Sequence, residues 1–502
     1  MYKLLSHFSK TVLFCILLIS HSFVWGQMQD TRPVNELYKA LTLEDNLYIL
    51  NMWGEQPAHM QQIYRHAFTI LDERPDATYA DLARHSGFQE LCRQHGIVHL
   101  GGPMLGDVRS DGAKVWVRTV KPARVTVVVE SEGRESTFGP VASTVEHDLT
   151  AIVELSGLKP ATSYSYKVLV DGVIVSNASD PVLTTLPDIY ELSDARIAVG
   201  TCYHRIGIGN QQLAHQILSR GPMAMLLGGD IAAQDRENNT AMHRADYMLR
   251  DFAPAWQRLS GSVPLFATWD DHDYFNNDKS GIPPGYSESD REAVWNVFRQ
   301  AWNNPAYGFG EDGKGVFFRT RIGPADVIML DNRYFRTGEK GSFLGPEQMQ
   351  WLEEQLLDCK GPFIILSCGT MWSDYVTNGK DSWGVNDPDG REQIFQLIEK
   401  NNIGGVLLIS GDRHGARGFR IPRPSGFSFY EFETASLGGR RGPAVTDPSW
   451  DTQLYGYADI FAFGEFSFNT TLSDPQVTFR LIEENGKELY AITLTKSQLT
   501  PP

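Results

Sequence analysis

The stretch "ATWDDHDYFNND", residues 267–278, places three carboxylates and one histidine side by side at Asp270–Asp273. It follows "SVPLF", residues 262–266, whose apolar composition is typical of a buried strand. Unpaired charge is costly to bury, and converging carboxylates raise one another's pKa. The crowding therefore predicts a counter-charge at this point of the fold.

Five further apolar runs of strand length stop at small or polar residues in the same way. They are "ARIAVG" (195–200), "AMLL" (224–227), "DVIML" (326–330), "PFIIL" (362–366) and "GVLLIS" (405–410). Between these runs lie segments whose apolar residues recur with helical spacing, as in residues 347–356 and 391–401. The alternation of the two patterns predicts an α/β domain. In such sheets the strand ends line the crevice where ligands bind. The residues at these ends are Cys202, Asp230, Asp271, Asp331, Ser367, Asp412 and His414.

A bound cation would neutralise several of these acids together. Carboxylate, imidazole and one thiolate suit transition metals, and the oxygen ligands also admit manganese or calcium. The thiol of Cys202 favours iron or zinc at one position. Two ions about 3.5–4 Å apart are the usual device for displacement at phosphorus. In such a centre Asp230 would bridge the ions and His272 would protonate the leaving oxygen.

Two arginines are candidates for binding a phosphate group, because a guanidinium matches phosphate oxygens bidentately. Arg333 lies in "LDNRYFR" (330–336) and Arg205 in "CYHRIG" (202–207). The alternative for each is a surface or structural ion pair.

The rest of the chain divides into regions by its periodicity. Residues 28–100 are predicted to be helical, with one helix over 58–71 and another capped by Asp76 or Thr78 and ending at Gly87. Residues 101–187 change to a period of two and predict a small β-sandwich. Residues 190–500 form the predicted α/β domain. Within the sandwich, "LSGLKPATSYSYKV" (155–168) resembles the fibronectin type III corner, in which the Tyr164 hydroxyl bonds nearby backbone.

Composition narrows the class of protein. A hydrophobic fraction of 42% and 11% aromatic residues are typical of a globular chain. A net charge of −16 argues against a general affinity for nucleic acid or anionic membranes. Cys92, Cys202, Cys359 and Cys368 are too few for a disulfide scaffold, and we expect thiols.

The first residues predict an export signal. Lys3 and Lys10 precede or flank the apolar run 11–25, and cleavage is expected near Gly26 or Gln27, so residues 1–27 are the predicted signal peptide. The run is shorter than the ~20 residues of a membrane span, although a retained anchor is the alternative. The prediction is an exported, periplasmic or extracellular protein without a transmembrane anchor after signal removal.

Several motifs together resemble the PhoD-like alkaline phosphatases, a branch of the calcineurin-type metallophosphoesterases. They are "GTCYH" (200–204), "GGD" (228–230), "TWDDHDYFNN" (268–277), "LDNRYF" (330–335), "LGPEQMQWLEEQL" (344–356), "DSWG" (381–384) and "SGDRH" (410–414). The resemblance implies a four-layer α-β-β-α sandwich and an exported, metal-dependent hydrolase of phosphate monoesters or diesters, in which metal-activated hydroxide attacks phosphorus. It implies metal ligation by Cys202, Asp230, Asp271, Asp412 and His414.

Further roles follow from the same resemblance. His272 would be the acid or transition-state group, and Asp271 and Arg333 would act with it. Asp270 would support the loop from behind the ligands.

The sequence departs from the family pattern at two positions. Ala233 stands where relatives carry a tyrosine that binds iron, with Asp235 nearby as a potential substitute. Gly415 stands where relatives often carry a second histidine. A centre of two or more ions therefore stays open between iron, zinc, manganese and calcium, and an inactive exported binding protein is the alternative function. Small phosphate esters, lipid head groups and cell-wall polymers stay open as substrates.

Overall fold

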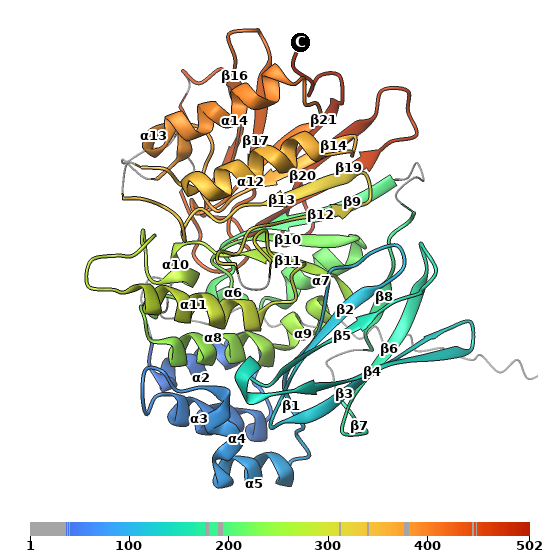
Figure 1. The fold of residues 1–502 in the computed structure, drawn as a ribbon, viewed down its shortest axis with the longest axis vertical. Coiled ribbons are helices and arrows are strands. Elements are labelled where there is room, and N and C mark those ends of the chain that lie inside the picture. The colour runs from blue at the N-terminus through green and yellow to red at the C-terminus, as the bar shows by residue number, and fades with distance from the viewer. Residues whose placement is uncertain are drawn as a thin grey trace, which may run out of the picture.

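The computed structural model describes residues 37, 39, 41–175, 180–188, 194–310, 313–338, 341–375, 381–443, 446–447 and 449–502. The predicted signal peptide, residues 1–27, lies outside these ranges. None of the helices in the described ranges has the length and apolarity needed to cross a membrane. The chain has a mixed α/β fold (Figure 1).

The N-terminal region is helical, as predicted. Its helices are α2 (Leu43–Asn51), α3 (Ala58–Leu71), α4 (Tyr79–Arg84) and α5 (Ser86–Gln94). Thr78 begins α4 with a capping box completed by Asp81. The predicted end at Gly87 is wrong, because α4 ends at Arg84. The His85 side chain then accepts the Phe88 amide at 3.1 Å and starts a new helix that contains Gly87.

Two small antiparallel sheets follow. One has the order β1 (His99–Gly106), β2 (Ala113–Thr119), β5 (Thr150–Leu155). The other contains β3 (Ala123–Ser131), β4 (Arg134–Ser143), β6 (Ser163–Val170), β7 (Val173–Ile174) and β8 (Val182–Thr184), and the short 3₁₀ helix η1 (Val145–His147) lies between β4 and β5. The Tyr164 hydroxyl accepts the Lys159 amide at 2.8 Å, which is the local bond expected at this corner.

Two larger mixed sheets form the rest of the fold. The six-stranded sheet has the order β11 (Leu265–Thr268), β10 (Ala224–Gly228), β9 (Asp194–Gly200), β19 (Ala462–Asn469), β20 (Gln476–Glu483), β21 (Glu488–Thr495). The seven-stranded sheet has the order β12 (Phe318–Ile322), β13 (Ala325–Met329), β14 (Phe363–Ser367), β15 (Val406–Ser410), β17 (Ser428–Glu433), β16 (Ala416–Pro422), β18 (Gln453–Tyr457). Strands β9–β11 are parallel to one another, and so are β13–β15.

The connecting segments contain nine helices within the described residues. They are α6 (His204–Gly207), α7 (Gln211–Ser219), α8 (Thr240–Phe252), α9 (Pro254–Ser262), α10 (Asp271–Tyr274), α11 (Glu288–Ala301), α12 (Gly345–Asp358), α13 (Trp383–Asn386) and α14 (Pro388–Lys400), preceded by the N-terminal set given above.

Alternating strand residues enter different hydrophobic clusters. Ile197 and Leu226 of one sheet share a cluster with Ile365 of the other. On the opposite faces, Met225 packs with residues of α7, α9 and α11, and Leu366 packs with residues of α12 and α14. Each large sheet thus has one face toward the other sheet and one face toward helices, as Figure 1 also shows.

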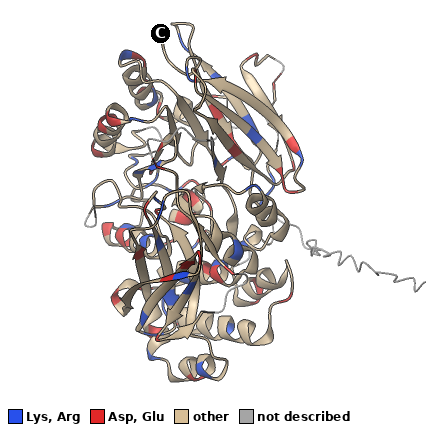
Figure 2. Cartoon of the chain, turned by 90° about the vertical axis from the view of Figure 1, so that its right-hand side faces the viewer, with Lys and Arg blue, Asp and Glu red and all other residues tan. Residues whose placement is uncertain are grey.

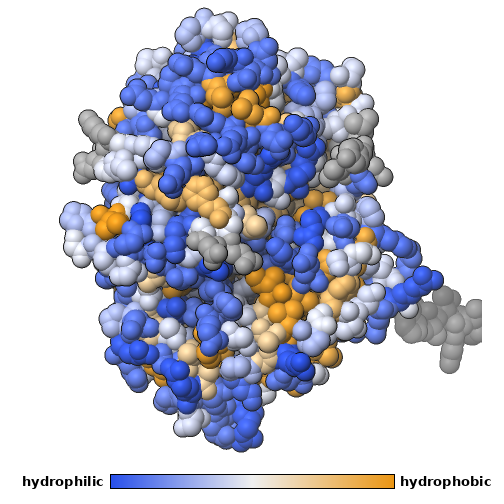
Figure 3. Space-filling view, viewed as in Figure 1, coloured by the Kyte–Doolittle hydropathy of each residue, from blue (hydrophilic) through white to orange (hydrophobic). Residues whose placement is uncertain are grey.

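Charged residues of both signs are spread along the chain. Figure 2 shows acidic and basic residues interspersed along the strands and helices. Figure 3 shows a mostly hydrophilic face with separate, smaller hydrophobic areas.

A buried arginine joins the small sheets to the helices. Arg118 of β2 donates to the Tyr79 hydroxyl at 2.9 Å and to the carbonyls of Asp148 and Gln300 at 3.1 and 3.3 Å. Its guanidinium also lies 3.7 Å from Asp251. One side chain therefore hydrogen-bonds groups from three separate segments and places its charge near a carboxylate of a fourth.

Replacing Arg118 by leucine (Arg118→Leu) is expected to lower the free energy of unfolding by about 3 kcal/mol, because buried acceptors lose their donor. Urea unfolding followed by circular dichroism measures it. The same change at the exposed Arg134 of β4 should stay within about 0.5 kcal/mol. Equal losses in the two variants would contradict the bracing role of Arg118.

Candidate functional site

The predicted site residues meet where the parallel strands of both sheets end. Cys202 follows β9, Asp230 follows β10 and Asp271 follows β11. From the other sheet, Asp412 and His414 follow β15. The structure therefore brings together, from four strand ends, the five residues that the sequence predicts as metal ligands.

One group of side chains combines sulfur, nitrogen and oxygen donors. Cys202, His204, Asp230 and His414 each offer a ligand atom within 4.8 Å of the others, and all four are buried. The Cys202 sulfur lies 3.7 Å from Asp230 Oδ2, and His204 Nε2 lies 3.9 Å from the same oxygen. Four convergent donors of this kind suit zinc or iron.

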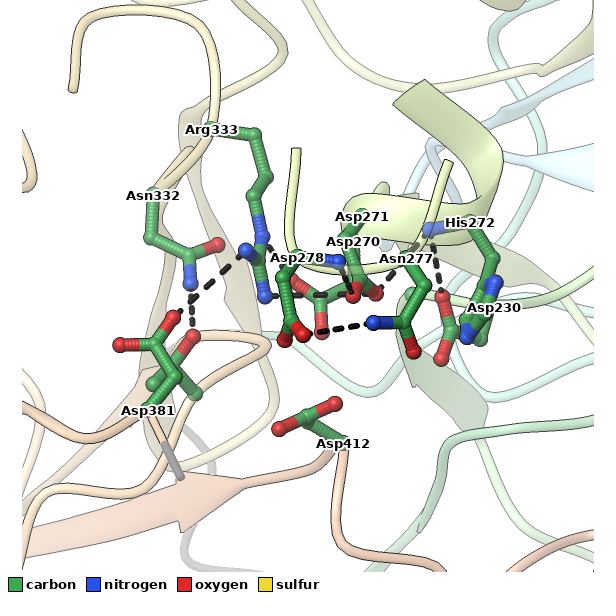
Figure 4. Close-up of polar contacts among 12 residues, drawn as sticks. Asp230, Asp270, Asp271, His272, Asn277, Asp278, Asn332, Arg333, Asp381 and Asp412 are labelled. Carbon is green, nitrogen blue, oxygen red and sulfur yellow. Dashed lines mark hydrogen bonds and ion pairs between the residues drawn. The ribbon is translucent and has the colours of Figure 1, made fainter. Parts of the chain in front are cut away.

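A second group is made of carboxylates. Asp230, Asp270, Asp271 and Asp412 also offer oxygens within 4.8 Å of one another, and Asp230 and Asp271 form a further group with His272 (Figure 4). Oxygen ligands suit manganese or calcium. Because Asp230 belongs to all three groups, it is the residue placed to touch two ions.

Burial sets the charge state of these acids. Desolvation raises the pKa of Asp230 and of Asp270 well above the usual range, with only partial relief from His272 and Arg333 respectively. Burial would also raise the pKa of Asp271, but His272, Arg333 and two backbone amides hold it below its usual value. A cation would keep all of them ionised.

The donor set fits metal ions on two further observations. Asp270 Oδ2 is buried and has no hydrogen-bond partner among the described residues. The histidines are in the neutral form that binds metals, since burial lowers the pKa of His204 well below its usual value and that of His414 to about 3. Burial and Asp230 raise the pKa of the Cys202 thiol, so a thiolate there needs a cation.

His414 is oriented by the backbone. Its Nδ1 lies 2.8 Å from the Arg440 carbonyl, which can only accept, so Nδ1 carries the proton and Nε2 carries the lone pair. The contact at Nδ1 thus favours the tautomer whose Nε2 can ligate a metal ion.

His272 is held by Asp235. Its Nδ1 lies 2.6 Å from Asp235 Oδ1, and its carbonyl accepts the Asp235 amide at 3.2 Å. Burial acts to lower the pKa of His272, but Asp271, Asp230 and Asp235 outweigh it and raise that pKa well above its usual value. Asp235, which the sequence offered as a potential substitute for the tyrosine ligand, has its Oδ1 engaged by His272 and belongs to none of the metal-ligating groups found among the described residues.

Arg333 lies among the acids. Its Nε donates to Asp270 at 2.5 Å, and its terminal nitrogens lie 4.0 Å from Asp271 and 3.6 Å from Asp381 (Figure 4). The side chain is 1% exposed. Arg333 therefore acts as a buried positive charge between the carboxylates. The predicted contact with a phosphate group would require substrate to reach this side chain, and its burial restricts that access.

Arg205 does not reach the acids, and its prediction as a phosphate-binding residue is wrong. Its side chain is fully buried, donates to Asn46 of α2 and lies 3.8 Å from Asp246 of α8. It is the structural ion pair that the sequence left as the alternative, because α2 and α8 enclose it.

The two departures from the family pattern have local explanations. Ala233 is buried in a hydrophobic cluster. At Gly415 a Cβ atom would lie 2.1 Å from the Pro443 carbonyl oxygen, so a side chain is excluded there.

Sequence reasoning missed His204, Asp235 as the partner of His272, and Asp278, whose amide donates to Asp271 at 2.6 Å. The signal for His204 was its place two residues after Cys202, at the same strand end. Asp331 and Ser367, also at strand ends, lie outside the metal-ligating groups found among the described residues. Asp331 instead accepts the Trp269 indole at 2.7 Å and nearby amides.

Several candidate ligands have left-handed backbone conformations. The φ angles are 54° at Cys202, 50° at His204, 57° at Asp230, 73° at Asp412 and 61° at His414. This region is unfavourable for residues other than glycine and costs of the order of 1 kcal/mol or more at each position. The turns after the strands therefore carry strain that aims these side chains inward.

Comparisons with known proteins agree with this geometry. The family model "PhoD-like phosphatase" matches residues 228–458, and a domain of unknown function, DUF7800, matches residues 98–186. Alkaline phosphatase D of Bacillus subtilis (strain 168) is 24% identical over 219 residues, which are 37% of this chain. The match spans 36% of the length of that curated relative.

Two solved structures share the fold. The structure of PhoD aligns with a TM-score of 0.65 at 17% identity, over 80% of this chain and 91% of its own. Purple acid phosphatase PPD1 from yellow lupin (Lupinus luteus) aligns with a TM-score of 0.57 at 14% identity, over 78% of this chain and 74% of its own. The fold is thus that of these phosphatases. The match of residues 228–458 to the PhoD-like phosphatase model, together with the shared fold, confirms the resemblance read from the motifs.

Replacing His204 by glutamine (His204→Gln) is expected to weaken metal binding at least tenfold, because the sulfur-containing group loses one of its two nitrogen donors. Metal content by mass spectrometry and the near-ultraviolet absorption of cobalt-loaded protein, which reports thiolate ligation, measure the effect. His243→Gln is the matched control, since His243 is equally buried but bonds only the Glu237 carbonyl among the described residues. Unchanged cobalt content and spectrum in His204→Gln would remove His204 from the ligand set.

Proposed function

We propose that this protein is an exported, metal-dependent phosphoesterase that hydrolyses phosphate monoesters, diesters or both. The observation that carries the proposal is Asp230, whose carboxylate is shared by a sulfur–nitrogen group and by an all-carboxylate group. Two unlike ion sites joined by one carboxylate suit a dinuclear centre for displacement at phosphorus. The PhoD-like domain supports the same reaction class.

Metal ions at these donors would supply Lewis acidity toward the phosphoryl oxygens and make a bound water more acidic. The remaining work falls to side chains. Arg333 and the amide of Asp278 hold Asp270 and Asp271 in place. These contacts would keep the carboxylates facing one point, so that the site needs no reorganisation during the reaction.

His272 is the proposed proton donor. Asp235 occupies Nδ1, so Nε2 is the nitrogen that can present a proton to the leaving oxygen. As the ester P–O bond breaks and a P–O bond to water forms, that proton would neutralise the departing alkoxide. Asp235 acts through His272 and is a positioning residue.

The inactive binding protein was suggested only by Ala233 in place of a tyrosine. His204 offers a further donor beside Cys202 and Asp230. The absence of the tyrosine is therefore not by itself a reason to prefer an inactive binding protein over an enzyme.

We also propose the finer architecture that the sequence predicts. Residues 28–100 would form a helical prelude, 101–187 a fibronectin III-like sandwich and 190–500 a four-layer α-β-β-α phosphoesterase domain. The match of DUF7800 to residues 98–186 and the two-sided packing of the large sheets support these divisions. Export rests on the composition of residues 1–27.

Hydrolysis of p-nitrophenyl phosphate and bis-p-nitrophenyl phosphate tests the activity, using protein loaded with manganese, zinc, iron or calcium. Asp230→Asn is expected to abolish turnover and to remove bound metal, because both groups lose their shared oxygen. Asp358→Asn makes the same change at an exposed carboxylate at the end of α12 and should leave both unaffected. Absence of turnover with every metal, from folded wild-type protein, would refute the proposed function.

A leaving-group series tests His272. His272→Gln should lower kcat about 10²–10⁴-fold for an alkyl ester, whose alkoxide needs a proton, and far less for a p-nitrophenyl ester. Asp235→Asn should shift the same ratio in the same direction by a smaller factor. Equal losses for good and poor leaving groups would show that His272 does not donate the proton.

A further inference from the structure

A groove adjoins the carboxylates on one side. It has a volume of about 730 Å³ and lies between the segment 278–284 and the segment 335–338, with Arg291, Asp381 and Asn386 completing its wall. Two of its residues also border the candidate site. The Asp278 amide donates to Asp271, and Asp381 lies 3.6 Å from Arg333 (Figure 4).

The groove is much larger than a phosphoryl group requires. Pockets for organic ligands span about 300–1,000 Å³. Ile282 is 46% exposed, and Pro283, Pro284 and Phe335 also line the groove. These side chains form an apolar surface, and a ligand that buried this surface would gain hydrophobic binding energy.

The charges of the groove differ from those of the chain as a whole. It is lined by three cationic residues and two acids, although the chain carries −16. Arg336 is paired with Asp381, and Arg291 is paired with Glu288. The Lys279 ammonium forms no ion pair with any residue in the described ranges, so it is the cation left for a ligand.

We infer that this groove binds the leaving alcohol of an organic phosphodiester, with its apolar body against Ile282 and Phe335 and an anionic group at Lys279. The inference rests on the proposed function and narrows its substrate class. In the reaction, water forms a P–O bond and the P–O bond to this alcohol breaks. The alcohol takes one proton and leaves through the groove, while the phosphate monoester stays at the carboxylates.

Two methyl aryl phosphodiesters test the inference. One has p-nitrophenol as its leaving group, and the other has a nitrophenol that also carries a carboxylate. Wild-type protein should show a lower KM for the carboxylate-bearing ester. Lys279→Glu should raise that KM about tenfold relative to the KM of the neutral ester, with kcat little changed.

Two further variants make the test specific. Ile282→Ser should raise KM for both aryl esters by a similar factor, because each loses apolar contact. Lys121→Glu makes the same charge change at an exposed residue between β2 and β3 and should leave the ratio of KM values at the wild-type level.

The outcomes separate the two levels of proposal. No hydrolysis of either ester by the metal-loaded wild-type protein would refute the proposed function, and with it this inference. Hydrolysis with KM values unaltered in both Lys279→Glu and Ile282→Ser would overturn the groove as the leaving-group site and leave the phosphoesterase intact.

Discussion

The structure depends on the mutual repulsion of carboxylates that are buried together at the ends of strands from two sheets. Asp230, Asp270 and Asp271 have almost no contact with solvent. Water therefore cannot screen them, and the protein has placed compensating charge in two ways. Arg333 and His272 supply part of it from the side, and cations held by the carboxylates would supply the rest. Loop conformation and histidine tautomer both follow from this requirement.

The sequence alone was enough to place the strand ends and most of the ligands. Apolar runs that stop at Cys202, Asp230, Asp271, Asp412 and His414 are a local signal, and parallel strands bring such ends together. The failures concern side chains whose partners are distant in the chain. Whether Arg205 faces substrate or Asn46, and whether Asp235 faces a metal or His272, depends on packing between segments that no local pattern encodes.

The N-terminal helices have more to do with the site than their composition suggests. Asn46 of α2 bonds Arg205, three residues beyond Cys202, and the indole of Trp53 donates to the Ile206 carbonyl at 2.5 Å. These contacts fix the turn that presents Cys202 and His204. The N-terminal helices contribute no side chain to the centre, but they help to determine the geometry of one candidate ion site.

The left-handed turns at the strand ends lower the stability of the fold but place the candidate ligands. Glycine would adopt the backbone of Cys202, His204, Asp230, Asp412 and His414 without penalty, yet none of these positions has it. In a descendant freed from the need for catalysis, glycine or asparagine at these positions would relieve strain and remove buried charge together. An inactive lineage would then drift toward greater thermal stability. In this chain all five positions instead carry side chains that can ligate a metal ion.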